Sequence, residues 1–402
     1  MRITGLNKTF DVTVDLVGSK SESNRALMIG YYGGFTPRIT NLSESDDTIL
    51  LAKILKDINA TKPLNALSAI DCANAGTVLR FLETALAFRP GDWLLTGSDR
   101  MLQRPVGDLV DALRTMGAEI EYVGQDGFPP LKIHGVGTNH VCPLKNINVD
   151  ITRSSQFASS LLLAMPVVET HGRASLHLDG DLSSIPYIDM TIDMMRKFGI
   201  DVHRNGRDIF VQQSEYQDVE YTIESDWTCA SYWYEIVAFS ENGRARLRNL
   251  HLDSKQGDAI VAKWFENFGV KSIQDGDDII IEKNRSIFFN DLSFDFINNP
   301  DLYPTIAATC FGLGLKGEFT GLRNLIHKES DRVAAMTTEL SRVETHGRAS
   351  LHVFDSHNDH RIAMALAPLA MKIGAIEINN ADVVSKSYPN FWTEFKKINP
   401  SL

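Results

Sequence analysis

Apolar and polar side chains alternate near the start of the chain. Polar residues separate Phe10, Val12, Val14 and Leu16, and side chains two positions apart lie on the same face of a strand. We therefore predict a strand within residues 1–17 that buries one face. Beyond it, many apolar residues recur at the three- and four-residue spacing that is typical of helices.

Six of the predicted helices follow a short polar segment, and these segments begin near residues 20, 75, 154, 227, 300 and 359. Small polar residues in such positions accept hydrogen bonds from the free N–H groups of the first helical turn. The helices expected after them are 26–31, 78–88, 157–165, 229–239, one that begins near Pro304, and 362–371. Six similar segments at uneven intervals indicate an internal repeat.

Three further amphipathic helices are each followed by two short strands with a glycine turn between them. These helices are 106–116, 188–198 and 260–268, and the order helix, strand, turn, strand indicates βαβαββ units. Six such units predict an α/β protein with mixed sheets. The polar patch 212–218 before a strand at 219–223 is the clearest change in composition, and it leaves three units on each side.

The length and composition are those of a globular protein. With 402 residues, of which 43% are hydrophobic and 23% charged, the chain is long enough for two or three domains. The first residues lack the apolar core of a secretory signal, and the longest nearly apolar run, 157–168, is too short to span a bilayer. We therefore expect a cytoplasmic protein with no membrane partner.

Cysteine usage and net charge exclude several classes of protein. The four cysteines stand far apart without a CxxC pair, which argues against a zinc site and a disulfide framework. A formal charge of −11 disfavours nonspecific binding of nucleic acid. It still permits a small phosphorylated substrate, because binding in a cleft depends on the local field.

Gly18–Arg25 (GSKSESNR) is a candidate anion site at a helix start. Free backbone N–H groups and the charges of Lys20 and Arg25 would favour a phosphate there. Ordinary capping by the serines explains the segment equally well. The segment lacks the spacing of a Walker A loop.

Lys328–Arg332 (KESDR) precedes another predicted helix, 333–340, and holds two cations and two carboxylates. On a helix Lys328 and Arg332 share a face, with Glu329 one step round. This arrangement suits an anionic ligand beside a carboxylate that can move a proton. The alternative is a solvated helix start stabilised by ion pairs, with Ser330 or Asp331 as the cap.

Seven cations of these segments would create a strongly positive site if the fold brought them together: Lys20, Arg25, Arg104, Lys328, Arg332, Arg361 and Lys386. Such a field would keep Asp301 and Glu329 ionised, and either could accept a proton. His357 and His360 have an HxxH spacing that is not a recognised metal motif. We expect no metal there.

The motifs together resemble those of the 3-phosphoshikimate 1-carboxyvinyltransferases, or EPSP synthases, of the enolpyruvyl transferase family. They occur in the family's order over nearly the whole chain. The matching segments are Gly18–Arg25, Asn74–Thr77, Arg104–Arg114, Ser154–Gln156, Ser184–Tyr187, Glu224–Asp226, Pro300–Asp301, Lys328–Arg332, Asn358–Arg361 and Ser385–Lys386. Each motif is weak alone, and the set is specific.

The resemblance implies a two-domain inside-out α/β barrel with three βαβαββ units in each domain. Residues 19–223 would form the shikimate 3-phosphate side, and 1–18 with 224–402 the phosphoenolpyruvate and catalytic side. The implied enzyme is a transferase of the shikimate pathway that leads to chorismate and aromatic amino acids. It would move the enolpyruvyl group of phosphoenolpyruvate to the 5-hydroxyl of shikimate 3-phosphate, as a monomer and without a cofactor or metal.

The resemblance also implies residue roles. Asp301, Glu329 and Lys20 would be catalytic. The shikimate 3-phosphate ligands would be Lys20, Ser21, Arg25, Ser154, Ser155, Gln156, Ser184, Tyr187, Asp301, Asn324 and Lys328. The phosphoenolpyruvate ligands would be Lys20, Gly76, Arg104, Gln156, Arg332, Arg361 and Lys386.

One departure from the family is an exact repeat, because VETHGRASLH occurs at 168–177 and again at 343–352. The second copy lies in a segment that is shorter than the family usually has there. Two other functions stay open. One is the sister transferase that acts on UDP-N-acetylglucosamine, although residues 98–108 lack the cysteine that it usually uses. The other is a non-catalytic homologue that binds phosphometabolites.

Overall fold

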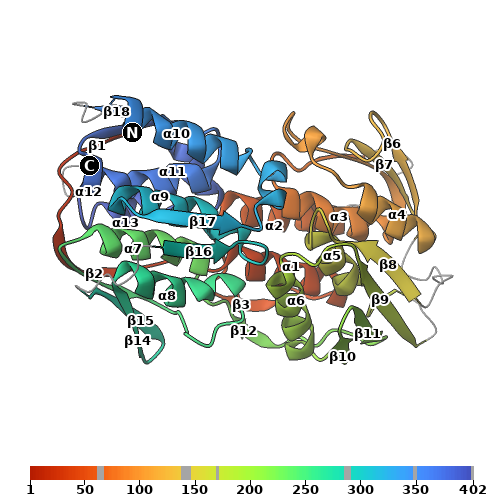
Figure 1. The fold of residues 1–402 in the computed structure, drawn as a ribbon. Helices are drawn as coiled ribbons and strands as arrows, with labels where there is room; N and C mark the ends of the chain where they lie inside the picture. Colours follow the sequence, from red (N-terminus) through yellow and green to blue (C-terminus); the bar gives the residue numbers. More distant parts are fainter. Residues whose placement is uncertain (61–67, 137–145, 169–171, 285–290, 347–350, 400–402) are drawn as a thin grey trace. The chain divides into compact units, whose positions relative to one another are not determined.

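The computed structural model of the chain (Figure 1) describes residues 1–60, 68–136, 146–168, 172–284, 291–346 and 351–399. The chain divides into two compact units. The first, called here the 20–223 unit, contains residues 20–40 and 47–223. The second, the 224–402 unit, contains residues 224–402 together with 1–19 and 41–46.

The 20–223 unit contains two sheets of the same design. In chain order they are formed by β4 (Ser68–Asp71), α3 (Gly76–Ala87), β5 (Gly91–Thr96), α4 (Gly107–Thr115), β6 (Glu119–Tyr122) and β7 (Leu131–Gly135), and by β8 (Asn146–Asp150), α5 (Gln156–Ala164), β9 (Arg173–Asp179), α6 (Ile185–Lys197), β10 (Val202–Asn205) and β11 (Asp208–Gln212). In each sheet the first two strands are parallel, and the last two form an antiparallel hairpin beside the second strand. Both stretches therefore have the order βαβαββ.

The 224–402 unit contains a third sheet of this design, and the start of the chain supplies its first strand. Strand β2 (Thr9–Val14) pairs in parallel with β13 (Asn242–Leu247), which lies beside the hairpin of β14 (Val270–Asp275) and β15 (Asp278–Lys283). The alternation in residues 1–17 therefore forms the predicted strand, with Val14 buried at its end. Strand pairing places this segment in a different unit from the helix that follows it.

The remaining strands form three smaller sheets. Two of them are in the 224–402 unit and join β16 (Asp291–Asp295) to β17 (Lys316–Thr320), and β1 (Arg2–Ile3) to β19 (Ile376–Asn379) and β18 (His352–Asp355). The third joins β3 (Arg38–Thr40) to β12 (Glu220–Thr222) in the 20–223 unit.

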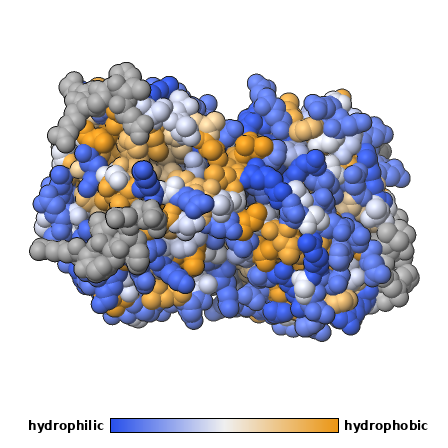
Figure 2. Space-filling model, viewed as in Figure 1, coloured by the Kyte–Doolittle hydropathy of each residue, from blue (hydrophilic) through white to orange (hydrophobic). Residues whose placement is uncertain are grey.

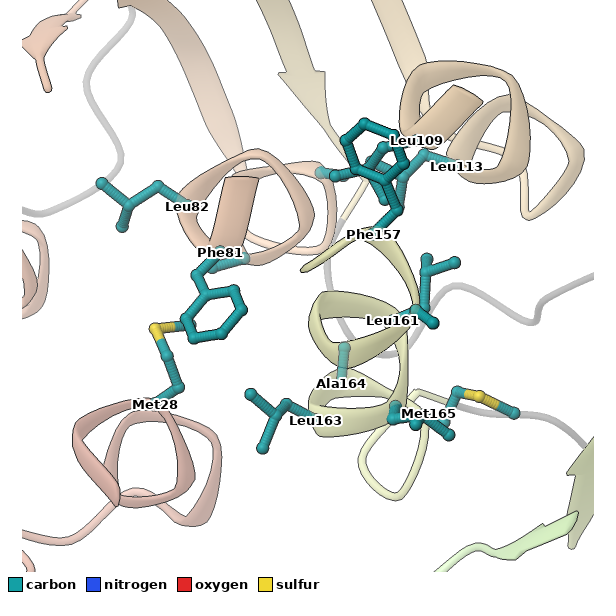
Figure 3. Close-up of a cluster of buried hydrophobic side chains, with 14 of the residues drawn as sticks. Met28, Phe81, Leu82, Leu109, Leu113, Phe157, Leu161, Leu163, Ala164 and Met165 are labelled. Carbon is teal, nitrogen blue, oxygen red and sulfur yellow. The ribbon is translucent and has the colours of Figure 1, made fainter. Parts of the chain in front are cut away.

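Each unit is built around helices that are apolar on all sides. Helix α5 is buried at every position after Gln156, and every residue of α7 (Trp227–Phe239) and of α11 (His360–Leu366) is buried. A helix of this kind must be surrounded by protein, because it has no face suited to water. Figure 3 shows Met28 of α1 (Lys20–Gly33) pointing towards Phe81 of α3, and Phe157 of α5 lying near Leu109 and Leu113 of α4.

The amphipathic helices cover these central ones. In α4 the buried positions are Leu109, Val110, Ala112 and Leu113, and the charged residues of the helix lie on the other side. In the 224–402 unit the amphipathic helix α10 packs on α9 and α11, whereas α9 itself is buried from Tyr303 to Cys310. The helices and 3-10 turns of that unit not yet given are η2 (Gly257–Ile260), α8 (Val261–Trp264), η3 (Phe265–Phe268), η4 (Pro300–Leu302), α9 (Tyr303–Leu313), η5 (Arg323–His327), α10 (Arg332–His346), η6 (Ala367–Leu369), α12 (Ala370–Ile373), η7 (Ala381–Lys386) and α13 (Phe391–Phe395).

Most helices begin within a few residues of their predicted starts, and two differ in form. The helix expected at 260–268 is a single α-turn between 3-10 segments, the form that short helical segments commonly take at their ends. The helix expected at 362–371 is interrupted by a 3-10 turn that contains Pro368, whose ring and missing N–H break α-helical hydrogen bonding. Helix α2 (Asp46–Ala60) was not predicted, although Leu51, Ile54, Leu55 and Ile58 have helical spacing.

The two copies of VETHGRASLH differ in secondary structure at two of the three positions that the structure describes in both copies. Val168 lies in a bend after α5 and Val343 lies in α10, and Leu176 lies in β9 whereas Leu351 precedes β18. The last residue of each copy is in a strand, His177 in β9 and His352 in β18. Residues 169–171 and 347–350 of the two copies lie outside the described ranges.

Hydrophilic side chains are spread over both units in the view of Figure 2, with smaller areas of hydrophobic residues between them. The large exposed hydrophobic side chains include Ile49 and Val123, at 56% and 58% exposure, which both belong to the 20–223 unit. Within the described ranges, no helix combines the length and the apolar character that crossing a membrane requires.

Candidate active site

The polar helix starts of the 224–402 unit meet one another. Thr228 in the first turn of α7 donates a hydrogen bond to the carboxylate of Asp258 in η2, at 2.5 Å between oxygens. The same carboxylate accepts a bond from Asn299, which caps η4 just before α9. These contacts bring the N-terminal ends of α7 and α9 together around one buried acid. The positive ends of helix dipoles favour anions at such a place.

Asp301 lies at the centre of this region and contacts three cations. Its Oδ1 is 2.6 Å from Nη1 of Arg332 and 3.5 Å from Nζ of Lys328, and its Oδ2 is 2.8 Å from Nη2 of Arg361. The cations come from the end of η5 and from the first turns of α10 and α11. Segments that are distant in sequence thus supply one compact charge cluster.

Arg332 binds three carboxylates and is 1% exposed. Besides Asp301, its Nη2 donates to Glu329 at 2.9 Å and its Nε donates to Asp359 at 2.8 Å. Asp359 also caps α11, because it accepts the N–H of Arg361, and it accepts the hydroxyl of Ser330 at 3.0 Å. Charge-assisted bonds of this kind hold a guanidinium in one orientation.

The pKa values of the acids follow from these contacts. Burial by itself would raise the pKa of Asp301, but the charges of Arg361, Lys328 and Arg332 outweigh it and hold the pKa well below 3.8. Burial and the nearby charge of Asp301 raise the pKa of Asp258 to about 6. The pKa values of two neighbouring carboxyl groups are therefore shifted in opposite directions.

The other expected residues of this unit lie at the same cluster. The Nζ of Lys386, in η7, is 3.9 Å from Oε1 of Glu329, and Lys386 is 9% exposed. Asn324 is buried in η5, the 3-10 turn that ends just before Lys328. Burial lowers the pKa of Lys328, although Asp301 opposes this shift.

In the 20–223 unit, Arg25 joins three helices. Its Nε donates to the hydroxyl of Thr191 on α6 at 2.7 Å, and one Nη2 hydrogen bond reaches Ser159 of α5 at 3.0 Å. Backbone oxygens of Ser21 and Tyr187 accept two further bonds, at 2.9 and 3.0 Å. Burial lowers the pKa of Arg25 to about 10. The N-terminal halves of α1, α5 and α6 therefore meet around one fixed cation.

A second chain of contacts in this unit links α3 and α5. The side chain of Gln156 accepts from Arg80 at 2.6 Å and donates to Thr77 at 2.8 Å, and its backbone N–H donates to the hydroxyl of Ser154. Arg80 also reaches the carbonyl oxygen of Pro105, next to Arg104. Gln156 is therefore held between two helix starts.

Gly76 and Arg104 are packed against each other. A Cβ atom at Gly76 would lie 2.6 Å from both Nη1 and Nη2 of Arg104, so only glycine leaves room for the guanidinium at the start of α3. Arg104 is 4% exposed, and its Nε and Nη1 have no hydrogen-bond acceptor among the described residues. A buried guanidinium in this condition is suited to an anionic ligand, because buried donors are otherwise nearly always paired.

The structure places the remaining predicted residues of this unit at the same helix ends. Lys20 begins α1 and lies 3.1 Å from Asp47 of α2. Ser155 and Ser184 are the cap residues of α5 and α6 and are both buried, and the left-handed φ of Ser184 is 55°. Ser21 and Tyr187 adjoin Arg25 through the backbone contacts described above.

The predicted residues thus gather within each unit: Lys20, Arg25, Gly76, Arg104 and Gln156 at helix starts of one, and the four other cations around Asp301 and Glu329 in the other. Sequence reasoning missed Asp47, Asp258 and the Arg332–Asp359 pair. A polar run before α2 and the Gln256–Asp258 segment before a helical turn are signals that could have located the first two. No spacing in the sequence indicates that Arg332 pairs with Asp359.

The cluster can bind anions and move protons. It combines helix N-termini and cations with carboxylates that are held in defined positions, which suits a substrate with phosphate and carboxylate groups. Within the ranges that the structure describes, no group of three or more His, Cys, Asp or Glu side chains is arranged to hold a metal ion. His360 is buried in the first turn of α11 and His357 contacts Glu339.

Comparison with known proteins connects this geometry to one family. The family model described as EPSP synthase (3-phosphoshikimate 1-carboxyvinyltransferase) matches residues 7–395. A protein named 3-phosphoshikimate 1-carboxyvinyltransferase from Bacteroides fragilis (strain YCH46) is 38% identical over 403 residues, which cover 96% of this chain and 94% of the relative. One of the same name from Vibrio cholerae (serotype O1, strain M66-2) is 34% identical over 423 residues, 96% of each chain.

Solved structures show the same fold. Two structures of EPSP synthase from Acinetobacter baumannii align with TM-scores of 0.73 and 0.74, at 23% and 22% sequence identity. The alignments cover 99% of this chain and 97% and 98% of those chains. The mixed α/β architecture is therefore shared with these proteins.

Proposed function

Because the chain belongs to the EPSP synthase family, we propose that its two groups of helix N-termini hold the two substrates of that family's reaction. The activity is that of a 3-phosphoshikimate 1-carboxyvinyltransferase of the shikimate pathway. The enolpyruvyl group of phosphoenolpyruvate moves to the 5-hydroxyl of shikimate 3-phosphate, and inorganic phosphate is released. The products are 5-enolpyruvylshikimate 3-phosphate and phosphate.

The observation that carries the residue assignment is the contact of Asp301 with Arg332, Arg361 and Lys328. These cations match the phosphate and carboxylate of phosphoenolpyruvate, and Lys386 adds a fourth charge beside Glu329. In the absence of substrate, Asp301, Glu329 and Asp359 neutralise them. The anionic substrate replaces part of this internal pairing.

Substrate binding then changes the basicity of Asp301. The cations keep its pKa low in the free protein. When the phosphate and carboxylate of phosphoenolpyruvate share the charges of Arg332 and Arg361, less of that charge acts on Asp301, and its pKa rises. A carboxylate that gains basicity when the substrate is bound can take the proton of the 5-hydroxyl.

The reaction proceeds by addition and elimination. The 5-oxygen, after losing its proton to Asp301, forms a bond to C2 of phosphoenolpyruvate while C3 gains a proton through Glu329. Phosphate then leaves C2, and C3 loses a proton to regenerate the double bond. Arg332 and Lys386 lie beside Glu329 and stabilise the charges that change there.

We assign to shikimate 3-phosphate Lys20, Ser21, Arg25, Ser154, Ser155, Gln156, Ser184, Tyr187, Asp301, Asn324 and Lys328. Gly76, Arg104, Gln156 and Lys20 join Arg332, Arg361 and Lys386 on phosphoenolpyruvate. The Nε and Nη1 of Arg104, which have no acceptor within the described part of the chain, support its assignment to phosphoenolpyruvate. The two units correspond in this proposal to domains 19–223 and 1–18 with 224–402 of an inside-out α/β barrel, in a cytoplasmic monomer.

The test is release of inorganic phosphate by the purified chain. We expect release only when phosphoenolpyruvate and shikimate 3-phosphate are both present, with a product that has the mass of 5-enolpyruvylshikimate 3-phosphate. UDP-N-acetylglucosamine in place of shikimate 3-phosphate serves as the control substrate. A folded chain that releases no phosphate with the expected pair, or releases it with the control, would disprove the assignment.

A further inference from the structure

Helix α10 carries a second buried charge in addition to Arg332. Glu339 is fully buried and follows Arg332 by seven residues, nearly two helical turns, so both side chains lie on one face of the helix. Both contact the segment 355–361 that leads from the end of β18 into α11. The mechanism described above uses Arg332 and leaves Glu339 without a role.

Every oxygen of Glu339 has a partner. Its Oε1 lies 2.7 Å from Nε2 of His357, and its Oε2 accepts the backbone N–H of Asp355 at 3.1 Å and Nη1 of Arg342 at 2.7 Å. A carboxylate this deeply buried is stable only when such partners surround it. Two of the three partners, Asp355 and His357, belong to segment 355–361, so Glu339 links that segment to α10.

The segment contains an unusual turn at this point. His357 and Asn358 both have left-handed φ angles, 52° and 53°, which residues with a Cβ adopt only at a cost in free energy. The backbone N–H of His357 donates to Asp355 at 2.6 Å, and the N–H of Asp359 donates to the oxygen of Ser356 at 2.9 Å. The contact between His357 and Glu339 is a tertiary contact that helps to hold this turn.

Two residues that follow the turn belong to the charge cluster. Asp359, directly after it, binds Arg332, and Arg361 binds Asp301 at 2.8 Å. Two contacts thus join helix α10 to the segment. In one, the cation Arg332 of the helix binds the anion Asp359 of the segment, and in the other, the anion Glu339 of the helix binds His357. Only one register satisfies both pairs, so the contact at Glu339 constrains the position of Asp359.

We propose that Glu339 and His357 are positioning residues for the phosphoenolpyruvate site. Their contact holds the turn at His357 and Asn358, so that Asp359 orients Arg332, and Arg361 projects towards Asp301. This proposal rests on the proposed function, in which Arg332 and Arg361 bind phosphoenolpyruvate. It predicts that loss of the contact weakens phosphoenolpyruvate binding without changing either arginine.

Three variants distinguish the effect of losing this contact from a general loss of fold stability. His357→Asn keeps a residue that tolerates left-handed φ but is too short to reach Glu339. His357→Gln restores a side-chain donor with a longer reach. His134→Asn is the matched control, because His134 contacts Asp92 at 2.8 Å on a sheet of the 20–223 unit.

For His357→Asn we expect the KM for phosphoenolpyruvate to rise about tenfold, the change that loss of one hydrogen bond to a charged group produces, while kcat stays close to wild type. His357→Gln should recover most of the loss, and His134→Asn should match wild type. A KM that is unchanged in His357→Asn, or a failure of His357→Gln to recover a raised KM, overturns the proposal.

Amide hydrogen exchange without substrate gives a second readout that does not depend on the proposed function. We expect faster exchange of residues 356–361 in His357→Asn than in wild type and in His134→Asn. If wild type released no phosphate, the proposed function would fail, and the exchange comparison would still decide whether the contact orders the turn. Equal exchange in all three proteins would overturn the ordering role of the contact.

Discussion

Nη1 of Arg332 lies 2.6 Å from Oδ1 of Asp301, so the cation assigned to phosphoenolpyruvate is already bound to the carboxylate assigned to proton transfer. Each keeps the other charged: the cations around Asp301 lower its pKa despite burial, and the carboxylates around Arg332 raise the pKa of the guanidinium despite burial. Substrate binding and the basicity of Asp301 are therefore coupled through one contact.

This coupling makes a prediction about Asp301→Asn. The variant should lower kcat by about 10²–10⁴-fold, the usual contribution of a general base. Phosphoenolpyruvate binding should stay the same or become tighter, because Arg332 and Arg361 lose an internal anion that competes with the substrate. Stopped-flow turnover and equilibrium binding check both effects. Asp331→Asn, at an exposed cap position of α10, is the control, and weaker phosphoenolpyruvate binding in Asp301→Asn would contradict the coupling.

Glu329→Gln tests the second carboxylate separately. The amide oxygen can still accept the bond from Arg332 that Glu329 accepts at 2.9 Å, so binding should change little. Proton transfer at C3 of phosphoenolpyruvate should slow by about 10²-fold or more. Incorporation of solvent deuterium at C3, measured by mass spectrometry, reports this step directly. Incorporation at the wild-type rate would remove Glu329 from the mechanism.

Gly76→Ala tests the close packing at Arg104. The new Cβ would lie 2.6 Å from two guanidinium nitrogens, so the guanidinium must move away from the start of α3. Because a displacement of about 1 Å can cost as much as 10²-fold, we expect a large rise in the KM for phosphoenolpyruvate and little change for shikimate 3-phosphate. Gly124→Ala is the control, since its nearest neighbour is Pro130 at 4.0 Å. Equal KM values in the two variants would show that Arg104 does not depend on Gly76.

Thr191→Val tests how Arg25 is oriented. The substitution keeps the shape of the side chain and removes the oxygen that accepts from Nε of Arg25 at 2.7 Å. We expect the affinity for shikimate 3-phosphate to fall about tenfold, the cost of one hydrogen bond to a charged group. Calorimetric titration measures it. Thr309→Val removes a buried hydroxyl that bonds the oxygen of Thr305 in its own helix, and it should leave the affinity unchanged. A similar loss in both variants would indicate a general effect on packing.

Glu235 makes a prediction about stability and pH. It is fully buried in α7, and burial raises its pKa well above 4.5. Above the unfolded pKa of about 4.3 the native state holds a proton that the unfolded chain releases, so stability falls as pH rises, by about 1.4 kcal/mol per pH unit, until the pH reaches the native pKa. Glu235→Gln should remove this fall. Urea unfolding between about pH 4 and pH 8 measures the difference, with the exposed Glu121→Gln as the control.

Urea unfolding of Glu235→Gln should be most informative at neutral pH. There the free energy of unfolding of Glu235→Gln should exceed that of wild type, and the gap should close near pH 4. A gap that is constant across the pH range would show that Glu235 does not carry a shifted pKa in the native protein.

Local pattern was sufficient to locate most helix starts and the candidate residues at them. The polar segments before α7 and α11 are recognisable because Asp226 and Asp359 cap these helices, and capping depends on a few neighbouring residues. The predicted caps before α3 and α5 differ, since Ala75 and Ser155 make no side-chain cap bond. The family motifs likewise occur as short segments, so Lys20, Asp301 and Arg332 could be named from the sequence. Helix α2 and the break at Pro368 were missed by the same local reading, although both have a signal in the residues themselves.

Contacts between distant segments could not be predicted from local sequence patterns. Asp258, Asp359 and Asp47 each acquire their role from a partner that lies far away in the chain. The repeat VETHGRASLH demonstrates the same limit, because its identical first residue lies after helix α5 at Val168 and within helix α10 at Val343. Spacing and capping determine where a helix can start. Burial against neighbours, with every polar group satisfied, decides which charges meet and which structure a segment adopts.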